Sequence, residues 1–126
     1  MNLFRSGLFQ LSSGKQTSWK IDCDALVDDD WKTLAGMVRL MVPSFRSVVG
    51  VPTGGLKLAE HLQPFCTIEG PLLIVDDVLT TGQSMEDTRR DREAVGVVVF
   101  ARGQCPIWIK SIFQMPENFW TKPRHR

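Results

Sequence analysis

The chain has 126 residues, a formal net charge of +1 at pH 7 and 43% hydrophobic residues. A chain of this length accommodates one domain with a buried core, and we expect a single domain over residues 1–126. The near-zero net charge gives no general attraction to nucleic acid or to an anionic membrane, and no apolar run reaches the length of a membrane span. Three separated cysteines without a CxxC pair indicate neither a zinc site nor a disulfide framework, so we expect free thiols and a cytoplasmic protein.

A hairpin and a helix are predicted at the N-terminal end. Segments 9–11 and 19–21 alternate hydrophobic and polar residues, and the turn residues 12–15 separate them. Asp28 to Asp30 suit the position just before a helix, and the helical spacing from Trp31 to Met41 predicts a helix that begins near Trp31. The basic residues of the C-terminal tail predict only a solvated chain end; they are Lys122, Arg124, His125 and Arg126.

Strands and helices alternate through the rest of the chain. Short apolar runs predict strands at 47–51, 72–75, 95–101 and 107–113, and helices are predicted at 56–62 and 84–93. Strands that are apolar throughout and alternate with helices indicate a parallel sheet covered on both faces. We therefore predict an α/β fold, a single-domain parallel sheet flanked by helices. Sheets of this kind bind ligands at the C-terminal ends of their strands.

An unusual polar segment follows the strand that ends at Val75. Two adjacent carboxylates, Asp76 and Asp77, can accept hydrogen bonds from vicinal sugar hydroxyls, and their like charges call for a cation or a polyhydroxyl ligand nearby. The turn that follows exposes backbone N–H groups before a helix, and its glycine lets an anion approach closely. This turn consists of Thr80, Thr81, Gly82, Gln83 and Ser84. The segment suits a ribose with a 5-phosphate, and an acid pair that merely caps a turn is the ordinary alternative.

A second glycine-containing loop follows the strand that ends at Val51. Its glycines permit unusual backbone conformations, and its N–H groups can face an anion. By itself this pattern is also that of a plain turn. The residues concerned are Thr53, Gly54, Gly55 and Lys57. Both unusual loops lie at strand ends, where such sheets bind ligands.

Leu72 to Ser84 resembles, without departure, the signature with which type I phosphoribosyltransferases bind phosphoribosyl pyrophosphate. The resemblance implies that Asp76 and Asp77 hold the ribose hydroxyls and serve catalysis by anchoring the ribose, and that residues 80–84 wrap the 5-phosphate. It also implies that Thr53 to Lys57 form the pyrophosphate loop, in which some relatives carry a lysine at the place of Gly54. It implies Mg²⁺ as well, held mainly by oxygens of the substrate and without a direct protein ligand.

Phe9 to Asp22 resembles the N-terminal signature of orotate phosphoribosyltransferases, which use it as part of a hood over the base. The resemblance implies a hood segment 1–30, a core 31–126 and base contacts from Trp19 and Lys20. Relatives carry a second aromatic residue at the place of Lys20, so the chain departs from the pattern there. Arg102 matches an arginine that contacts the pyrimidine acid, and a guanidinium fork suits a planar carboxylate. A plain surface hairpin and a solvated arginine are the alternatives.

The interval from Lys57 to Gly70 is too short for the long mobile loop that orotate phosphoribosyltransferases insert between the two binding loops. Without this lid, the site is open to water and lacks cations that stabilise departing pyrophosphate. The resemblance leaves two functions open. The first is an enzyme, a pentosyltransferase of pyrimidine biosynthesis that transfers ribose 5-phosphate to a pyrimidine base, orotate above all. The second is a non-catalytic or regulatory protein that binds phosphoribosyl pyrophosphate or a nucleotide. We expect a homodimer, since the family pairs its subunits.

Overall fold

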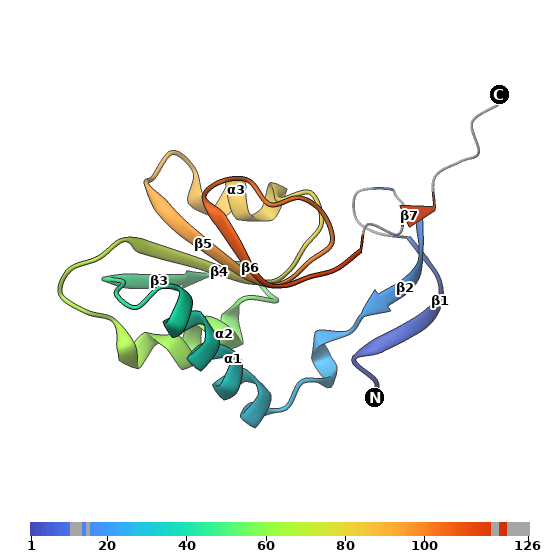
Figure 1. Ribbon diagram of the computed structural model, residues 1–126, viewed down its shortest axis with the longest axis horizontal. Helices are drawn as coiled ribbons and strands as arrows, with labels where there is room; N and C mark the ends of the chain where they lie inside the picture. The colour runs from blue at the N-terminus through green and yellow to red at the C-terminus, as the bar shows by residue number, and fades with distance from the viewer. Residues whose placement is uncertain (11–13, 15, 117–118, 121–126) are drawn as a thin grey trace.

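Two sheets organise the part of the chain that the computed structural model describes, which is residues 1–10, 14, 16–116 and 119–120, the last two by their backbone alone. A four-stranded sheet has the order β3-β4-β5-β6, and a three-stranded sheet has the order β1-β2-β7. The second sheet projects beyond one end of the first (Figure 1). The molecule is therefore elongated, with an α/β body and a smaller β-structure beside it.

The four-stranded sheet is parallel throughout. Its strands are β3 (Ser47–Gly50), β4 (Leu72–Leu79), β5 (Ala94–Ala101) and β6 (Ile109–Gln114). The apolar sequences of β4 and β5 suit strands that are buried on both faces, and nearly all of their residues are buried. The predicted parallel sheet is confirmed.

Helices cover both faces of this sheet (Figure 1). The helices are α1 (Asp28–Met41), α2 (Leu56–Leu62) and α3 (Gln83–Arg89). α1 and α2 pack on one face and α3 on the other, where Met85 is its buried residue. None of the helices in the described ranges is long and apolar enough to cross a membrane.

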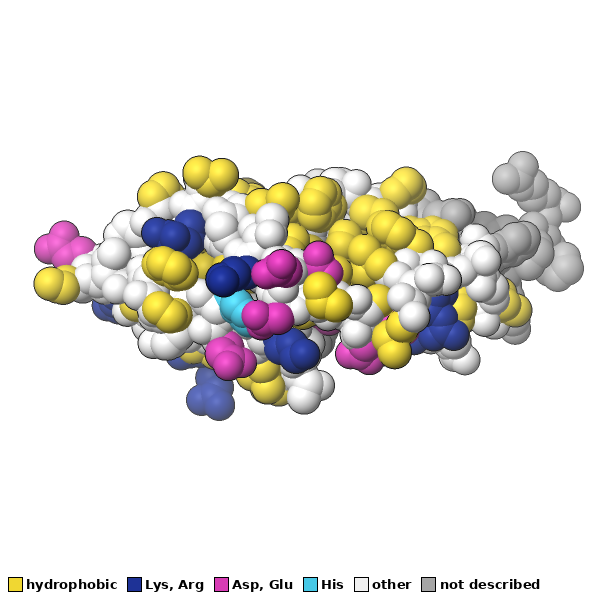
Figure 2. Space-filling view, turned by 90° about the horizontal axis from the view of Figure 1, so that it is seen from below, with side chains coloured by type: hydrophobic (Ala, Val, Ile, Leu, Met, Phe, Trp, Pro, Cys, Tyr) yellow, Lys and Arg dark blue, Asp and Glu magenta, His cyan; other side chains and the backbone are white. Residues whose placement is uncertain are grey.

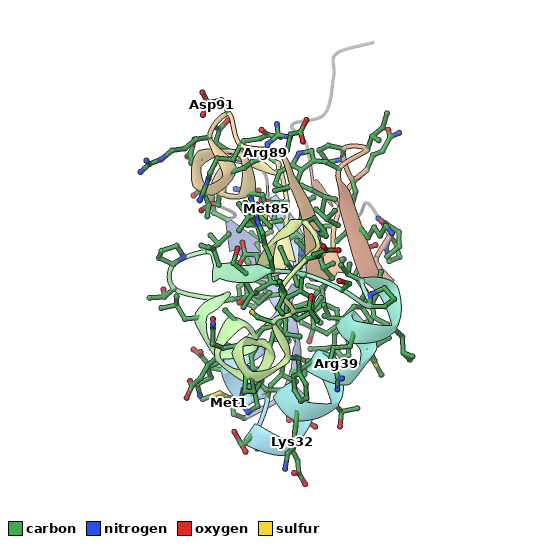
Figure 3. All side chains as sticks on the ribbon, turned by 90° about the vertical axis from the view of Figure 1, so that its left-hand side faces the viewer. Met1, Lys32, Arg39, Met85, Arg89 and Asp91 are labelled. Carbon is green, nitrogen blue, oxygen red and sulfur yellow. The ribbon has the colours of Figure 1, made fainter. Side chains whose placement is uncertain are left out.

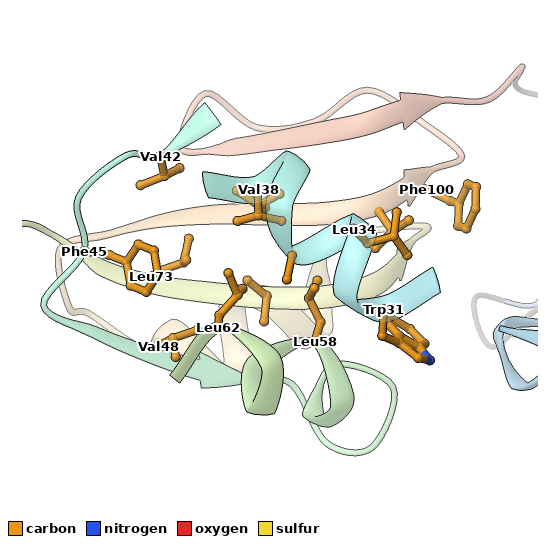
Figure 4. Close-up of a cluster of buried hydrophobic side chains, with 14 of the residues drawn as sticks. Trp31, Leu34, Val38, Val42, Phe45, Val48, Leu58, Leu62, Leu73 and Phe100 are labelled. Carbon is orange, nitrogen blue, oxygen red and sulfur yellow. The ribbon is translucent and has the colours of Figure 1, made fainter. Parts of the chain in front are cut away.

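The larger core lies between the sheet and the helices α1 and α2 (Figure 4). The helical spacing of the sequence places Trp31, Leu34 and Val38 on one face of α1, and all three side chains are buried. Leu58 and Leu62 of α2 are fully buried in the same cluster. This packing fixes α2, and with it the loop that precedes α2, against β3 and β4.

On the other face of the sheet, a loop covers the area that α3 leaves open. The return from β5 to β6 takes only residues 102–108, whereas parallel strands are usually joined by a dozen or more residues that include a helix. A Cβ atom added to Gly96 would lie 2.7 Å from Met85 Cε and 2.9 Å from the Trp108 ring. The absence of a side chain at Gly96 therefore makes room for both covering residues.

The hood hairpin consists of β1 (Phe4–Gln10) and β2 (Gln16–Ile21), which are antiparallel, and β7 (Phe119–Trp120) pairs with β2. The predicted hairpin is confirmed and is longer than expected. Phe4 of β1 meets Phe100 of the core sheet edge-on, with ring centres 6.3 Å apart. Three predicted turn residues, Ser12, Ser13 and Lys15, lie outside the described residues. So do Leu11 and the basic residues of the tail, Lys122, Arg124, His125 and Arg126.

Three element boundaries differ from the sequence prediction. α1 begins at Asp28, because Asp30 Oδ2 accepts a hydrogen bond from the Val27 N–H at 2.9 Å, so the three acidic residues form the first turn. β4 continues to Leu79, because its ladder with β5 extends past the acid pair. α3 ends at Arg89, and Arg90 follows with a φ of 59°. The remaining helices and core strands begin and end within one or two residues of their expected positions.

The crowding at Gly96 gives a test of the fold. Gly96→Val should lower the free energy of unfolding by about 1–3 kcal/mol, since the new side chain would displace Met85 and Trp108. Urea unfolding measures the effect. Gly36→Ala in α1 is the matched control; a Cβ atom there meets nothing within 4 Å, and alanine should stabilise the helix by about 0.5–1 kcal/mol. Equal stability of the Gly96 variant and the wild type would show that the covering loop packs differently.

Candidate functional site

Two adjacent carboxyl groups lie near the C-terminal end of β4. Asp76 is buried, and its Oδ1 accepts a hydrogen bond from the Asp77 N–H at 2.8 Å. Asp77 is half-buried, and its Oδ1 accepts one from the Val78 N–H at 2.7 Å. Burial, followed by the hydrogen bond and charge of Asp77, raises the pKa of Asp76 to about 8. At neutral pH the pair therefore holds a proton, which a ligand with a cation could displace.

The loop after β3 reaches the same acid pair. A Cβ atom on Gly54 would overlap the carboxylate of Asp77, so glycine is required for the two to lie together. Thr53, Gly54, Lys57 and Asp77 line a pocket of about 180 Å³. Three of the four residues predicted for the pyrophosphate loop thus meet one of the predicted ribose residues.

Gly55, the fourth residue of that prediction, has a different position. It does not line the pocket, because it packs against the carbonyl oxygen of Val75. Its N–H donates to the Val51 carbonyl oxygen at 2.8 Å and is not available to an anion. Gly55 therefore holds the loop close to β4 and does not form the expected contact.

The turn between β4 and α3 forms a second pocket, of about 270 Å³. Its lining includes Asp76 and all five residues of the predicted phosphate turn, which are Thr80, Thr81, Gly82, Gln83 and Ser84. Gly82 has a φ of 85°, in the left-handed region, and immediately precedes the helix. The side chain of Gln83 donates to Asp87 Oδ1 at 2.7 Å along α3. The structure therefore brings the whole predicted phosphate segment together beside the acid pair.

Arg102 and Trp19 come together from opposite ends of the chain. The guanidinium carbon of Arg102 lies 3.5 Å from the centre of the Trp19 ring, and its Nη2 donates to the Trp19 carbonyl oxygen at 2.5 Å. Only 2% of Arg102 is exposed, and burial lowers its pKa. Its Nη1 is buried without a partner among the described residues, whereas buried donors normally have one. Arg102 thus attaches the hood to the end of β5 and keeps one donor for a further acceptor.

Comparisons with known proteins extend this geometry. No protein-family model matches the chain. The sequence is 29% identical over 154 aligned positions to an orotate phosphoribosyltransferase of Pyrobaculum aerophilum, and the match covers 88% of this chain and 80% of that protein. The structure superposes on the orotate phosphoribosyltransferase of Aeropyrum pernix with a TM-score of 0.69 and 22% identity, over 90% of this chain and 88% of that one. For the enzyme of Mycobacterium tuberculosis the TM-score is 0.61 and the identity 18%, over 89% of both chains.

The chain is similar in sequence and in fold to orotate phosphoribosyltransferases. Its fold is the type I phosphoribosyltransferase fold, as the resemblance of Leu72 to Ser84 implied. The alignment of 154 positions is longer than the 126 residues of this chain, so the archaeal relative has residues without a counterpart here.

The chain has only a short connection at the place where the sequence resemblance predicts that the long mobile loop is missing. Between the loop after β3 and the start of β4 lie only α2, the short helix η2 (Gln63–Phe65) and residues 66–71. Nδ1 of His61 in α2 donates to the Lys57 carbonyl oxygen at 2.8 Å, and its Nε2 lies 2.9 Å from Asp28 Oδ1, with which the protonated ring forms an ion pair. Figure 2, which shows this side of the molecule, has side chains of both charges around a histidine. His61 therefore joins α2 to α1.

Lys20 is the predicted base-binding residue that the structure does not bring to the site. Successive side chains of a strand point to opposite faces, so Lys20 and Trp19 of β2 cannot both face Arg102. Lys20 is exposed, and its Nζ lies 5.8 Å from the centre of the Phe9 ring. The sequence alone did not show that Trp19 and Lys20 lie on opposite faces of β2.

Three residues at the first pocket were not among the predicted site residues; they are Cys23, Asp24 and Trp31. Cys23, in the short helix η1 (Cys23–Ala25), lies beside Asp77, and burial together with this carboxyl raises the pKa of the thiol. Trp31 of α1 lines the same pocket, and its Nε1 is buried without a partner among the described residues. Helical spacing had identified Trp31 only as a core residue. Among the described residues no group of three or more His, Cys, Asp or Glu side chains could hold a metal ion.

The pKa of Asp76 gives a prediction on stability. Between its ordinary pKa of 3.8 and about 8, the folded protein holds a proton that the unfolded chain has lost, so the free energy of unfolding should fall as pH rises through this range. Asp76→Asn removes this contribution, and the variant should lose less stability than the wild type between pH 5 and pH 8, by at least about 1.4 kcal/mol. Urea unfolding at the two pH values measures the difference. Asp91→Asn, at an exposed position after α3, should behave as the wild type does. An unchanged pH dependence in Asp76→Asn would contradict the raised pKa.

Proposed function

We propose that the protein is a compact phosphoribosyltransferase that transfers ribose 5-phosphate from phosphoribosyl pyrophosphate to a pyrimidine base, with orotate as the first candidate, and releases pyrophosphate. The proposal rests on one observation. Three segments lie together at the C-terminal ends of two adjacent parallel strands, β3 and β4. The acid pair lies between the glycine loop after β3 and the turn before α3. The likeness to orotate phosphoribosyltransferases supports the choice of base.

Each segment has a distinct role in the proposed reaction. Asp76 and Asp77 hold the two vicinal hydroxyls of the ribose, and residues 80–84 hold its 5-phosphate with backbone N–H groups and hydroxyls. Thr53, Gly54 and Lys57 hold the pyrophosphate. The bond between ribose C1 and the pyrophosphate oxygen breaks and a bond to the base nitrogen forms, while the proton of that nitrogen leaves with the pyrophosphate. The base itself is the nucleophile, so no residue of the protein needs to act as one. The positive charge that develops on the ribose lies beside the Asp77 carboxylate, which stabilises it.

The acid pair also fits a magnesium ion that arrives with the substrate. Two neighbouring carboxyl groups, one with a raised pKa, favour a cation nearby, and Mg²⁺ prefers carboxylate and phosphate oxygens. The described residues offer no complete ligand set, so we propose that the substrate supplies most of the coordinating oxygens. The ion would neutralise the charge of the pyrophosphate. Binding of the magnesium complex should then displace the proton of Asp76.

For the base, we propose a place next to Arg102. The guanidinium has one donor without a partner among the described residues, which suits the carboxylate or carbonyl of an acidic pyrimidine. Trp19 covers this guanidinium at 3.5 Å. Because only 2% of Arg102 is exposed, a base can reach this donor only after residues around it move, and we propose that the hood moves when the base binds.

A second candidate is a non-catalytic protein that binds phosphoribosyl pyrophosphate or a nucleotide. The short connection between α2 and β4 favours it, because no long loop is available there to cover the site or to bring cations to the leaving group. The homodimer and the cytoplasmic location that the sequence suggested stay predictions.

An assay of pyrophosphate release separates the two candidates. The wild-type protein, given phosphoribosyl pyrophosphate and Mg²⁺, should release pyrophosphate with orotate and much less with uracil or a purine base. The double variant Asp76→Asn, Asp77→Asn should lose both release and substrate binding in isothermal titration, while its melting curve shows a folded protein. Substrate binding without release for any base would favour the non-catalytic candidate. A folded double variant with unchanged affinity would remove the acid pair from the ribose site.

The phosphate turn is tested by two substitutions of Gly82. A Cβ atom there would be 3.9 Å from Leu79 Cδ1 and 4.0 Å from Pro106 Cγ, so a side chain has room, and the requirement for glycine comes from the φ of 85°. Valine is strained at such a φ, whereas asparagine adopts it readily. Gly82→Val should abolish stabilisation by ribose 5-phosphate and by nucleoside monophosphates in a thermal shift assay, and Gly82→Asn should largely keep it. A valine variant with the wild-type shift would place the phosphate elsewhere.

A further inference from the structure

A polar cluster joins α3 to the loop that precedes β6. Glu86 Oε1 accepts a hydrogen bond from Trp108 Nε1 at 2.7 Å, and Glu86 Oε2 accepts one from Arg89 Nη2 at 2.7 Å. The guanidinium carbon of Arg89 lies 4.3 Å from the centre of the Trp108 ring. Each of the three side chains thus contacts the other two. We call this group the Trp108 cluster.

α3 needs such an attachment because it has little else to hold it. It has only seven residues, and isolated helices of that length are not stable in water. Met85 is its one buried residue, and Figure 3 shows the Met85 side chain between the helix and the sheet. The Trp108 cluster adds contacts at Glu86, directly after Met85, and at Arg89, one turn further along the helix. The helix is therefore attached to the body at two places.

The loop that carries Trp108 also lies behind the phosphate turn. Pro106, in the same loop, would be 4.0 Å from a Cβ atom at Gly82. Trp108 fills the space above Gly96, where Met85 also packs. The short return from β5 to β6 is therefore adjacent to both the turn and the helix that follows it.

The negative charge of Glu86 is paired within the cluster, which is compatible with a phosphate bound nearby. Glu86 lies in the first turn of α3, close in sequence to the turn that we assign to the 5-phosphate. A free carboxylate there would repel an anion. The ion pair with Arg89 and the indole N–H both take up this charge. The carboxylate can thus hold the helix while its effect on the phosphate is reduced.

We propose that Trp108 is a positioning residue for the 5-phosphate, which acts through Glu86 and Arg89. It holds α3 against the sheet and thereby keeps residues 80–84 in the conformation that presents their N–H groups to the ligand. This inference rests on the proposed function, because it assumes that the turn binds the phosphate. It concerns the 5-phosphate alone, since the pyrophosphate loop belongs to β3 and α2 and does not touch the cluster.

Trp108→Phe is the central variant, because it keeps an aromatic side chain at this position and removes the N–H that Glu86 accepts, together with part of the ring. The Kd of ribose 5-phosphate should rise about tenfold, which corresponds to the loss of one hydrogen bond of about 1.4 kcal/mol. The Kd of pyrophosphate should stay as in the wild type. Amide hydrogen exchange of residues 82–86 should become faster without any ligand. Ile107→Ala is the matched control, since Ile107 lies in the same loop and is fully exposed.

A second variant guards against a general loss of stability. Glu86→Leu removes the same contact and the ion pair with Arg89 as well, so its loss for ribose 5-phosphate should be at least that of Trp108→Phe, and the double variant should be little worse than Glu86→Leu alone. Equal losses for ribose 5-phosphate and pyrophosphate, or no loss for either, would overturn the positioning role. If the wild type does not bind ribose 5-phosphate, the proposed function is wrong and the positioning role with it. If the wild type binds it and the variants bind it equally well, only the positioning role is wrong.

Discussion

The burial of a carboxyl pair inside a parallel strand is the constraint on which the rest of the site depends. Asp76 lies in the ladder between β4 and β5, where a charged carboxylate is poorly solvated. Its carboxyl group therefore keeps its proton at pH values well above the ordinary pKa of an aspartic acid. Asp77 occupies the space next to it, so the neighbouring loop must approach without a side chain, at Gly54. The pair thus determines which residues can surround it. The shared proton is what relieves like-charge repulsion in this pair, and a ligand that brings a cation could take the place of that proton.

The sheet register connects this pair to the base side of the site. Leu79, at the end of β4, pairs with Ala101 of β5, and its carbonyl oxygen accepts the Arg102 N–H at 2.9 Å. Arg102 in turn holds Trp19 of the hood. One contiguous series of backbone and side-chain contacts therefore runs from the acid pair to the hood. If the hood moves when a base binds, as proposed above, the surroundings of Arg102 would change directly, and through Arg102 those of the end of the strand that carries the acids.

Local features of the sequence predicted more of this molecule than long-range ones. Strands buried on both faces are apolar throughout, so their runs are visible in the sequence, and the residues of the phosphate turn are contiguous. Contacts between distant segments were not visible: Trp19 and Arg102 are 83 positions apart, and their contact depends on how the hood sits on β5. The continuation of β4 through its acids depends on pairing with β5, which polar residues alone do not suggest. Lys20 was assigned to the base from the resemblance of the N-terminal segment, and the sequence alone does not say which face of β2 each residue occupies.

The short connection between α2 and β4 changes what the remaining groups must do. Lys57 is the only cationic side chain of the described chain that lines the pocket at Thr53 and Gly54, and the N–H of Gly55 is already engaged. A leaving pyrophosphate would therefore find few protein charges, in a site open to water, where each charge is also worth less than in an enclosed one. Under the proposed function, neutralisation would then fall mainly on a magnesium ion that enters with the substrate. Binding of the 5-phosphate would then be more important for the reaction. The binding energy of this remote group would keep the ribose in position while few charges stabilise the leaving group.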